Sequence, residues 1–306
     1  MVKKRIIKTV ILLVLLAVGW GTLSAADVEF PLIQSMTYFP YRDNTTLFKN
    51  QWRLSLDMYY SNVYMYDVER TTVNDMELLT NTLAAGYGLS DRLTLELYYR
   101  FGVAFGGILD DLIVNFHDIF GLREGGRNDY PRNQVNYSYK DAFSYDGGTA
   151  FQSPVILGVL GNLYRGEYVH LNARLALGLP LASRPGFTSN KSFMTLGLIL
   201  LYKKNQFSLD FSSHLSFFKN PSWLAGEDMT PRIFQSGIRI DYRKFFAGFL
   251  YRGTPFRGGD LSNAAYQVYL GIRFLKSFEF AFIEEFPPVD TTPDVTFNLK
   301  INLLKQ

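Results

Sequence analysis

The stretch from Phe207 to Phe217 has the sequence Phe-Ser-Leu-Asp-Phe-Ser-Ser-His-Leu-Ser-Phe. Its odd-numbered positions are apolar, with the exception of Ser213, and its even-numbered positions are all polar. A repeat of two residues is the signature of an extended strand with one apolar and one polar face. The stretch is long for a strand of a soluble protein, and about as long as a strand that crosses an outer membrane at a tilt. It therefore predicts a membrane-crossing β-strand.

The same alternation recurs along the chain, in about twelve segments, and the connections between the segments alternate in length. The segments are 52–61, 76–87, 93–101, 155–163, 169–177, 191–202, 207–217, 234–243, 245–252, 266–274, 278–286 and 295–303. Short turns fall at 88–92, 165–167, 203–206, 243–244 and 275–277, and longer loops at 106–153, 180–190, 219–231, 253–263 and 286–294. Short turns at one end and long loops at the other are typical of a transmembrane barrel. The sequence thus predicts an all-β fold, an antiparallel up-and-down transmembrane β-barrel of about twelve strands. A soluble β-sandwich also alternates, but gives no reason for the strict alternation of connection lengths.

The first 26 residues have the pattern of a secretory signal peptide. A basic region ending at Lys8 precedes an apolar run from Val10 to Val18, and Ser24-Ala25-Ala26 supplies small residues for cleavage near Ala26. We therefore expect export through the inner membrane of a Gram-negative bacterium and a single barrel domain over 27–306 in the outer membrane. Removing residues 1–26 leaves 27 basic against 28 acidic side chains, so we expect no nucleic-acid partner.

The composition also argues against several kinds of site. Cysteine is absent, which excludes disulfides, thiolate metal ligands and a thiol nucleophile. The three histidines, His117, His170 and His214, are far apart in sequence, so no metal-ligand spacing is visible. No phosphate loop or dinucleotide fingerprint is present, and we expect neither a metal nor a cofactor.

Two segments fall outside the strand pattern. Residues 27–47 are predicted to be irregular and to lie either at the periplasmic mouth or inside the lumen. Residues 106–152 are predicted to form a long external loop that contains a short amphipathic helix. The helix packs over the barrel rim or lies in the outer leaflet in one interpretation; in the other it is a lid over the lumen. The candidate lid residues are Ile108, Leu112, Phe116, His117 and Phe120.

The polar faces of the strands are expected to line the lumen. The predicted lumen-lining residues are Arg53, Asp57, Glu96, Arg100, His170, Arg174, Asp210, His214, Arg239, Asp241, Arg273 and Lys300. Side chains fill much of the interior of a barrel of this size. Since both charge signs are present, the set fits a network that stabilises the wall and equally a polar path for a small solute.

His214 and Ser216 are the only weak candidates for catalysis. Outer-membrane lipid hydrolases place a His and a Ser two residues apart on one strand, and these two residues have that spacing. The alternation, however, points both side chains into the lumen, whereas such enzymes act at the lipid surface. Enzyme activity is therefore left open, with an enzyme the less favoured class.

The segment Phe116-His117-Asp118-Ile119-Phe120-Gly121-Leu122, followed by Gly126-Arg127, resembles a bacterial family known as domain of unknown function 3187. The resemblance covers most of the chain after the leader and implies an outer-membrane β-barrel, with no assigned activity or binding residues. The chain departs from the usual outer-membrane ending, because it closes on Lys305-Gln306 and not on an aromatic residue.

The leading functional hypothesis is porin-like or transporter-like passage of a small solute of unknown identity. The alternative is a structural or interaction barrel with a blocked lumen and partner-binding external loops. In either case the expected partners are outer-membrane lipid, including lipopolysaccharide, and the assembly machinery of the outer membrane.

Overall fold

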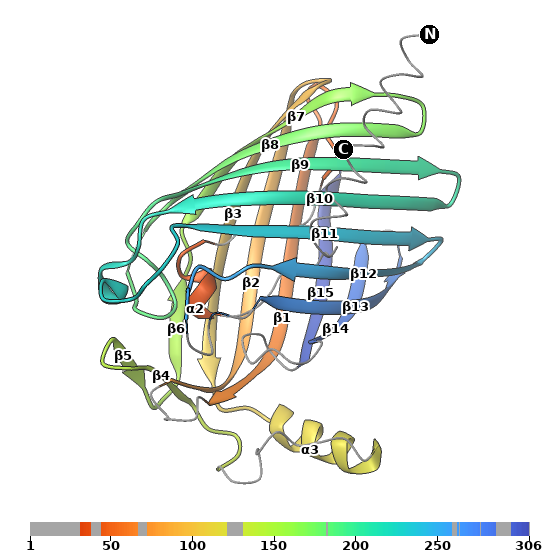
Figure 1. Cartoon of the computed structure of the whole chain (residues 1–306). Helices are drawn as coiled ribbons and strands as arrows, with labels where there is room; N and C mark the ends of the chain where they lie inside the picture. Colours follow the sequence, from red (N-terminus) through yellow and green to blue (C-terminus); the bar gives the residue numbers. More distant parts are fainter. Residues whose placement is uncertain are drawn as a thin grey trace.

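The computed structural model describes residues 31–37, 44–66, 72–120, 131–181, 183–258, 262, 264–275, 277–285 and 295–305. Within these residues, twelve long antiparallel strands form a closed barrel (Figure 1). They are β1 (Trp52–Tyr66), β2 (Thr72–Ser90), β3 (Leu93–Phe105), β7 (Val155–Arg165), β8 (Val169–Leu179), β9 (Phe193–Lys204), β10 (Phe207–Phe218), β11 (Arg232–Tyr242), β12 (Phe245–Arg252), β13 (Ala265–Phe274), β14 (Phe278–Glu285) and β15 (Val295–Lys305). The predicted signal peptide lies outside the described residues.

Each barrel strand pairs with its neighbours in the chain, and the ring closes where the first strand meets the last. β1 pairs with β2 on one side and with β15 on the other, and Met58 lies opposite Leu299 in the closing pair. A closed sheet gives every backbone N–H and C=O group a partner without leaving an edge, which hydrocarbon requires. The predicted barrel and its strand number are confirmed.

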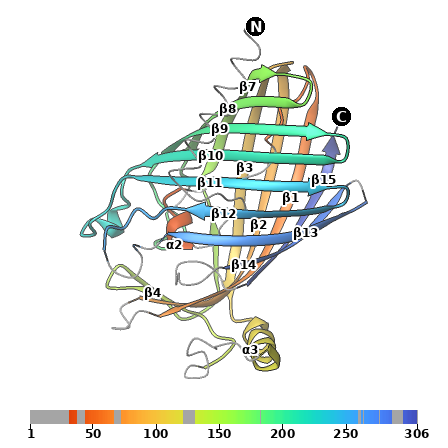
Figure 2. The ribbon, with the colours of Figure 1, turned by 45° about the vertical axis from the view of Figure 1, so that its right-hand side comes forward.

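The two ends of the barrel differ as the connection lengths predicted. We call the end with the short turns, such as the one between Lys204 and Phe207, the turn end, and the opposite end the loop end. In outer-membrane barrels the turn end faces the periplasm and the loop end faces the outside. Figure 2 shows the strands from a second direction, with the turns at one end and the longer connections at the other.

Along the strands, the polar side chains are buried and the apolar side chains are exposed, which is the reverse of the pattern in a soluble protein. On β3, the polar Thr94, Glu96 and Arg100 are 0 to 4% exposed, whereas Leu95 and Leu97 are 41% and 43% exposed. The apolar side chains therefore cover the outside of the barrel and the polar side chains fill its interior. This arrangement suits a surface in contact with lipid acyl chains.

The long connection between β3 and β7 carries more structure than the sequence predicted. The expected helix is α3 (Leu109–Phe120), and three short strands that were not expected follow it: β4 (Asn136–Tyr139), β5 (Phe143–Tyr145) and β6 (Thr149–Gln152). β4 extends the sheet beside the loop-end part of β2, and β6 does the same beside β3. Within the described residues, no helix is long and apolar enough to span a membrane.

Candidate functional site: the filled interior of the barrel

The described residues 31–37 and 44–47 of the N-terminal segment lie inside the barrel, which is one of the two positions expected for it. Residues 31–34 form the single helical turn α2 (Pro31–Gln34), seen within the ring of strands in Figures 1 and 2. Leu32, Ile33 and Met36 are at most 1% exposed and pack against interior side chains of β1 and β2 such as Val63 and Met76. The segment was expected to be irregular, and this one turn of helix is its regular part.

α2 lies toward the loop end, where the loops close around it. The backbone N–H of Ser189, in the loop between β8 and β9, donates to the carbonyl of Ser35 at 2.9 Å. Its neighbours Phe187 and Thr188 are also buried. The loop therefore covers the segment and also holds it by a backbone hydrogen bond.

Aromatic side chains from three loops build the rest of the loop end. The ring of Phe187 lies 4.8 Å from that of Phe151 and 4.8 Å from that of Tyr137, and the ring of Phe143 lies 5.6 Å from that of Trp223. The Tyr137 hydroxyl donates to the carbonyl of Gly186 at 2.7 Å, and burial raises the pKa of this phenol well above its usual range. The phenol therefore stays neutral, as a buried donor must.

The turn-end half of the interior is charged. Arg174 on β8 makes a two-pronged contact with Glu96 on β3, with nitrogen–oxygen distances of 2.8 and 3.0 Å and both side chains fully buried. Arg53 on β1 approaches the same carboxylate at 3.6 Å. Paired guanidinium and carboxylate groups are the arrangement in which charge is tolerated away from water.

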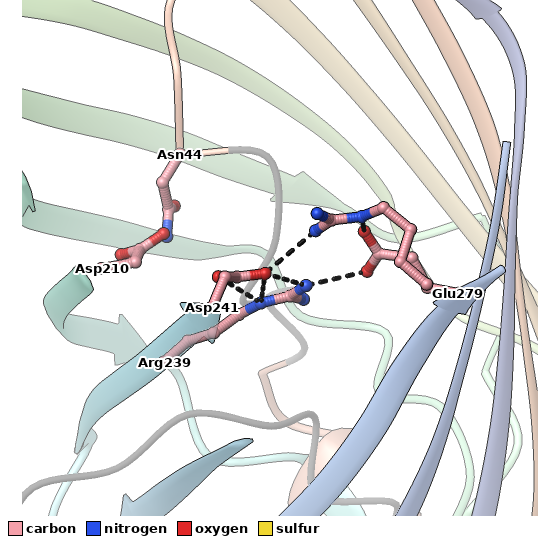
Figure 3. A network of polar contacts seen from close by, with 6 residues as sticks. Asn44, Asp210, Arg239, Asp241 and Glu279 are labelled. Atoms are coloured by element: carbon pink, nitrogen blue, oxygen red, sulfur yellow. Dashed lines mark hydrogen bonds and ion pairs between the residues drawn. The ribbon is translucent and has the colours of Figure 1, made fainter. Parts of the chain in front are cut away.

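A second cluster continues the charged wall around β11, β13 and β14. Arg239 bonds Asp241 at 2.9 Å and Glu279 at 3.0 Å, and Arg273 bonds the same two carboxylates at 2.9 and 3.0 Å. Figure 3 shows Arg239, Asp241 and Glu279 converging in the interior. Two cations and two anions thus form a closed four-membered network with no net charge, which we call the arginine–carboxylate square.

Asn44 connects the N-terminal segment to the charged, turn-end half of the interior. Its side-chain NH2 donates to both carboxylate oxygens of Asp210 at 2.8 and 3.0 Å, and its side-chain oxygen accepts from Arg174 at 2.8 Å. Its backbone carbonyl accepts from the side chain of Asn172 at 2.6 Å. Figure 3 shows Asn44 reaching Asp210 across the space beside the square. One residue of the segment therefore connects β8 with β10.

After Asn44, the segment follows the wall down to the turn end. The backbone N–H of Leu47 donates to the Thr94 hydroxyl at 2.8 Å, and Arg53 donates to the carbonyl of Thr45 at 3.2 Å. At the mouth, the N–H of Asn50 donates to the carbonyl of Gly88 at 2.8 Å. The described parts of the segment therefore reach from the loop-end core to the turn-end mouth.

The remaining predicted lumen residues also have defined places. Asp57 and Lys300 are both 4% exposed and lie opposite each other in the β1–β15 register. Arg100 is 1% exposed, with its guanidinium 5.3 Å from the ring of Phe151 at the loop end. His170 is half-buried near the turn between β7 and β8.

The two weak catalytic candidates lie in the interior and not at the lipid surface. His214 and Ser216 are 2% and 1% exposed, and the Ser216 hydroxyl is 2.7 Å from the Thr195 hydroxyl. The His214 ring occupies the space that a Cβ atom would need at Gly197 on the adjacent strand, so the glycine makes room for the imidazole. Both residues therefore contribute to the packing of the β9–β10 wall.

Two of the candidate lid residues, Ile108 and Leu112, do not face the interior of the barrel. The beginning of α3 is attached to the outward face of β1 and β2. The side chains of Phe116, His117 and Phe120 lie outside the described part of the structure. In the part of the chain that the structure describes, α2 of the N-terminal segment lies inside the barrel and α3 lies outside it.

Two parts of the interior were not predicted from the sequence. α2 and Asn44 belong to a segment without periodicity, and the aromatic residues of the loop end come from separate loops. A polar asparagine beside Arg42 and Asp43 was the only local signal at Asn44. Within the described residues, no group of three or more His, Asp or Glu side chains could hold a metal ion.

The sequence model of one protein family, described as "Protein of unknown function (DUF3187)", matches residues 14–303. The chain therefore belongs to this family. No curated protein matches it.

The fold is similar to that of a solved outer-membrane channel. The COG4313 outer membrane channel from Pseudomonas putida F1 is 12% identical, with a TM-score of 0.53 over 84% of this chain and 96% of that one. The "CymD monoaromatic hydrocarbon channel" is 12% identical, with a TM-score of 0.43 over 92% and 98%. A Pseudomonas aeruginosa FadL homologue is 10% identical, with a TM-score of 0.38 over 92% and 99%. At 12% identity, the likeness to the first of these structures concerns the fold alone, which is that of an outer-membrane barrel.

Proposed function

We propose that this member of the DUF3187 family is an outer-membrane channel for a small solute, with residues 31–50 as an internal plug. The observation that carries the proposal is the way the segment is held. Its described residues form no strand with the wall, and β1 to β15 pair with one another without it. The barrel can therefore stay closed when the segment moves.

The contacts of the plug are of a kind that can break and form again. Toward the turn end it is held by individual hydrogen bonds, and the strongest of these join Asn44 to charged partners. When the plug moves, Arg174 keeps its bond to Glu96, and the arginine–carboxylate square is unaffected. Movement of the plug would leave a passage whose wall carries paired charges of both signs, which suits a small polar or zwitterionic solute better than an ion of one sign.

A reversible tether tests whether the plug must move. The chain has no cysteine, so Ser35→Cys with Ser189→Cys introduces the only two thiols, at positions whose backbones are joined by a 2.9 Å hydrogen bond. We expect the oxidised variant to show no conductance in planar bilayers and reduction to restore the conductance of the parent protein. The single variant Ser35→Cys, under the same oxidation, is the matched control.

A specific observation also favours the alternative, a barrel with a blocked lumen whose loops bind a partner. α2 and the aromatic loops fill the loop end, and Leu32 and Phe187 are at most 1% exposed. If the parent protein and a variant lacking residues 31–43 both fail to conduct or to swell liposomes, the channel proposal fails and the blocked barrel is supported.

A further inference from the structure

Two polar residues on the outward face of the barrel are buried. Asn62 on β1 and Glu77 on β2 lie opposite each other in the register, on the face that carries Leu54 and Leu83 farther along the same strands. Leu54 and Leu83 are 36% and 39% exposed, whereas Asn62 and Glu77 are each 1% exposed. A carboxylate on the lipid-facing side of a barrel is costly near the bilayer core, so a cover over it is needed.

The beginning of α3 is that cover. The N–H of Leu109 donates to one oxygen of Glu77 at 2.5 Å, and the Tyr60 hydroxyl donates to the other. Asn62 donates to Asp110 at 2.9 Å. A Cβ atom on Gly107 would collide with the Glu77 carboxylate, so the chain can approach this closely only at a glycine. Glu77 thus accepts one of the backbone N–H groups that a helix leaves without a partner at its start.

The far side of α3 is an apolar ridge. Ile108 just before the helix, and Leu112 and Ile119 within it, are 72%, 54% and 77% exposed. At 100° per residue these three side chains fall within about 40° of one another. The opposite side contains Leu109, Ile113 and Val114, which are 3 to 4% exposed. The packed face and the exposed ridge are therefore different surfaces of one helix.

A polar strip runs along one side of the ridge. Asp111, Asn115 and Asp118 are exposed and lie between the ridge and the packed face. Hydrogen bonds from Asn133 and then Arg132 lower the pKa of Asp111, so this carboxylate stays charged at neutral pH and needs water. An apolar ridge beside a charged strip is the pattern of a helix at a membrane–water boundary.

We propose that α3 is a wall helix that lies in the outer leaflet, with its Ile108–Leu112–Ile119 ridge in contact with lipid acyl chains. β3, which pairs with β2 and leads into the helix, also carries lipid-facing side chains, since its Leu95, Leu97 and Phe101 are 37 to 43% exposed. Figures 1 and 2 both show α3 beside the loop-end parts of β1 to β3 and outside the ring of strands. The helix covers the polar Asn62 and Glu77 and exposes its own apolar ridge, so it extends the lipid-facing surface.

Spin labels placed on single cysteines test this position, since the chain has no cysteine of its own. The ridge variants are Leu112→Cys and Ile119→Cys, and Asp111→Cys reports the polar strip. Leu97→Cys on β3 is the lipid reference and Asp228→Cys, in the loop between β10 and β11, is the water reference, since its side chain is 74% exposed. Each labelled protein is reconstituted in phosphatidylcholine vesicles, and its collision rates with oxygen and with a water-soluble nickel chelate are compared.

The expected result is a ratio of oxygen to nickel collisions at 112 and 119 that matches the ratio at 97. At 111 the ratio should shift toward that at 228. Ratios at 112 and 119 equal to that at 228 would place the ridge in water and overturn the proposal. Spin–spin broadening at 112 and 119 that disappears on dilution with unlabelled protein would show a second copy on the ridge, and would equally overturn it.

Discussion

The two halves of the barrel interior are filled by different chemistry. The loop-end half is apolar and aromatic and encloses α2, whose Leu32 is 0% exposed. The turn-end half is charged and meets the same segment through Asn44, which bonds Asp210 and Arg174. Apolar packing tolerates small shifts because it has no preferred direction, whereas each charged contact needs its partner within about 3 Å.

This difference assigns separate tasks to the two halves. In the loop-end half, the burial of apolar area supplies the free energy that keeps the plug inside. In the turn-end half, the ion pairs stabilise the wall in any position of the plug, since Glu96, Arg174 and the arginine–carboxylate square belong to the strands. Among the described residues of the plug, Asn44 makes side-chain contacts with the charged wall, through Asp210 and Arg174. Substitutions that remove the contacts of one half at a time test this division.

The first prediction concerns an ion pair in the charged half. In Arg174→Ala, the Glu96 carboxylate loses its two bonds at 2.8 and 3.0 Å and keeps only Arg53 at 3.6 Å. A buried charge left with so weak a partner costs about 3–5 kcal/mol. The free energy of unfolding, measured by guanidinium titration of the protein in lipid vesicles with tryptophan fluorescence, should fall by about that amount.

The matched variant removes both charges. Arg174→Met combined with Glu96→Leu leaves no unpaired charge, so its loss of stability should be clearly smaller than that of Arg174→Ala. Equal losses in the two proteins would mean that packing, and not charge pairing, decides the stability of this half.

The second prediction concerns the packing of the apolar half. Leu32→Ala removes a fully buried side chain from the loop-end core and should weaken the docking of the plug by about 3 kcal/mol. Because α2 is not part of the sheet, the loss should appear in the segment and not in the barrel. Amide hydrogen exchange should rise for residues 31–37 and stay unchanged for β10. Leu275→Ala, at a position 76% exposed in a turn, is the control and should change neither.

The fold could be predicted from the sequence because its determinant is local. Two-residue alternation in segments such as 207–217 assigns each side chain to the lipid or to the interior without any knowledge of its neighbours. Charges such as Glu96 and Arg174 were placed inside on that basis, and they are buried there. Their pairing, by contrast, depends on the register between β3, β7 and β8, which the alternation does not contain.

The filling of the barrel could not be predicted, since it depends on contacts between distant segments. Tyr137 bonds Gly186 across 49 residues, and Asn44 bonds Arg174 across 130. The helix α3 was predicted from its spacing, but its place depends on Glu77, an acidic residue on the outward face of β2. Glu77 lies within the strand predicted from about residue 76 onward. An acidic residue on the outward face of that strand was a signal in the sequence, but the strand pattern alone did not explain it.

The third prediction separates the plug from the wall. Asn44 uses both ends of its amide, because the NH2 group donates to Asp210 and the oxygen accepts from Arg174. Asn44→Ala removes both contacts to charged partners, which should weaken the docking of the plug by about 2 kcal/mol. The stability of the barrel should hardly change, since Arg174 retains Glu96. Openings in planar-bilayer recordings should become more frequent, by about 30-fold if the whole loss acts on the closed state.

Asn44→Asp sharpens the same test. It keeps the size of the side chain and the acceptor for Arg174, but it places a carboxylate where the NH2 group now lies 2.8 Å from an oxygen of Asp210. Two carboxylates at that distance repel each other, so openings should be more frequent than in Asn44→Ala at neutral pH. They should decline as acidification protonates one of the two groups. Asn190→Ala, at an exposed asparagine in the loop between β8 and β9, is the control. If Asn44→Ala, Asn44→Asp and Asn190→Ala all conduct like the parent protein, Asn44 does not hold the plug, and the two halves of the interior are not linked through it.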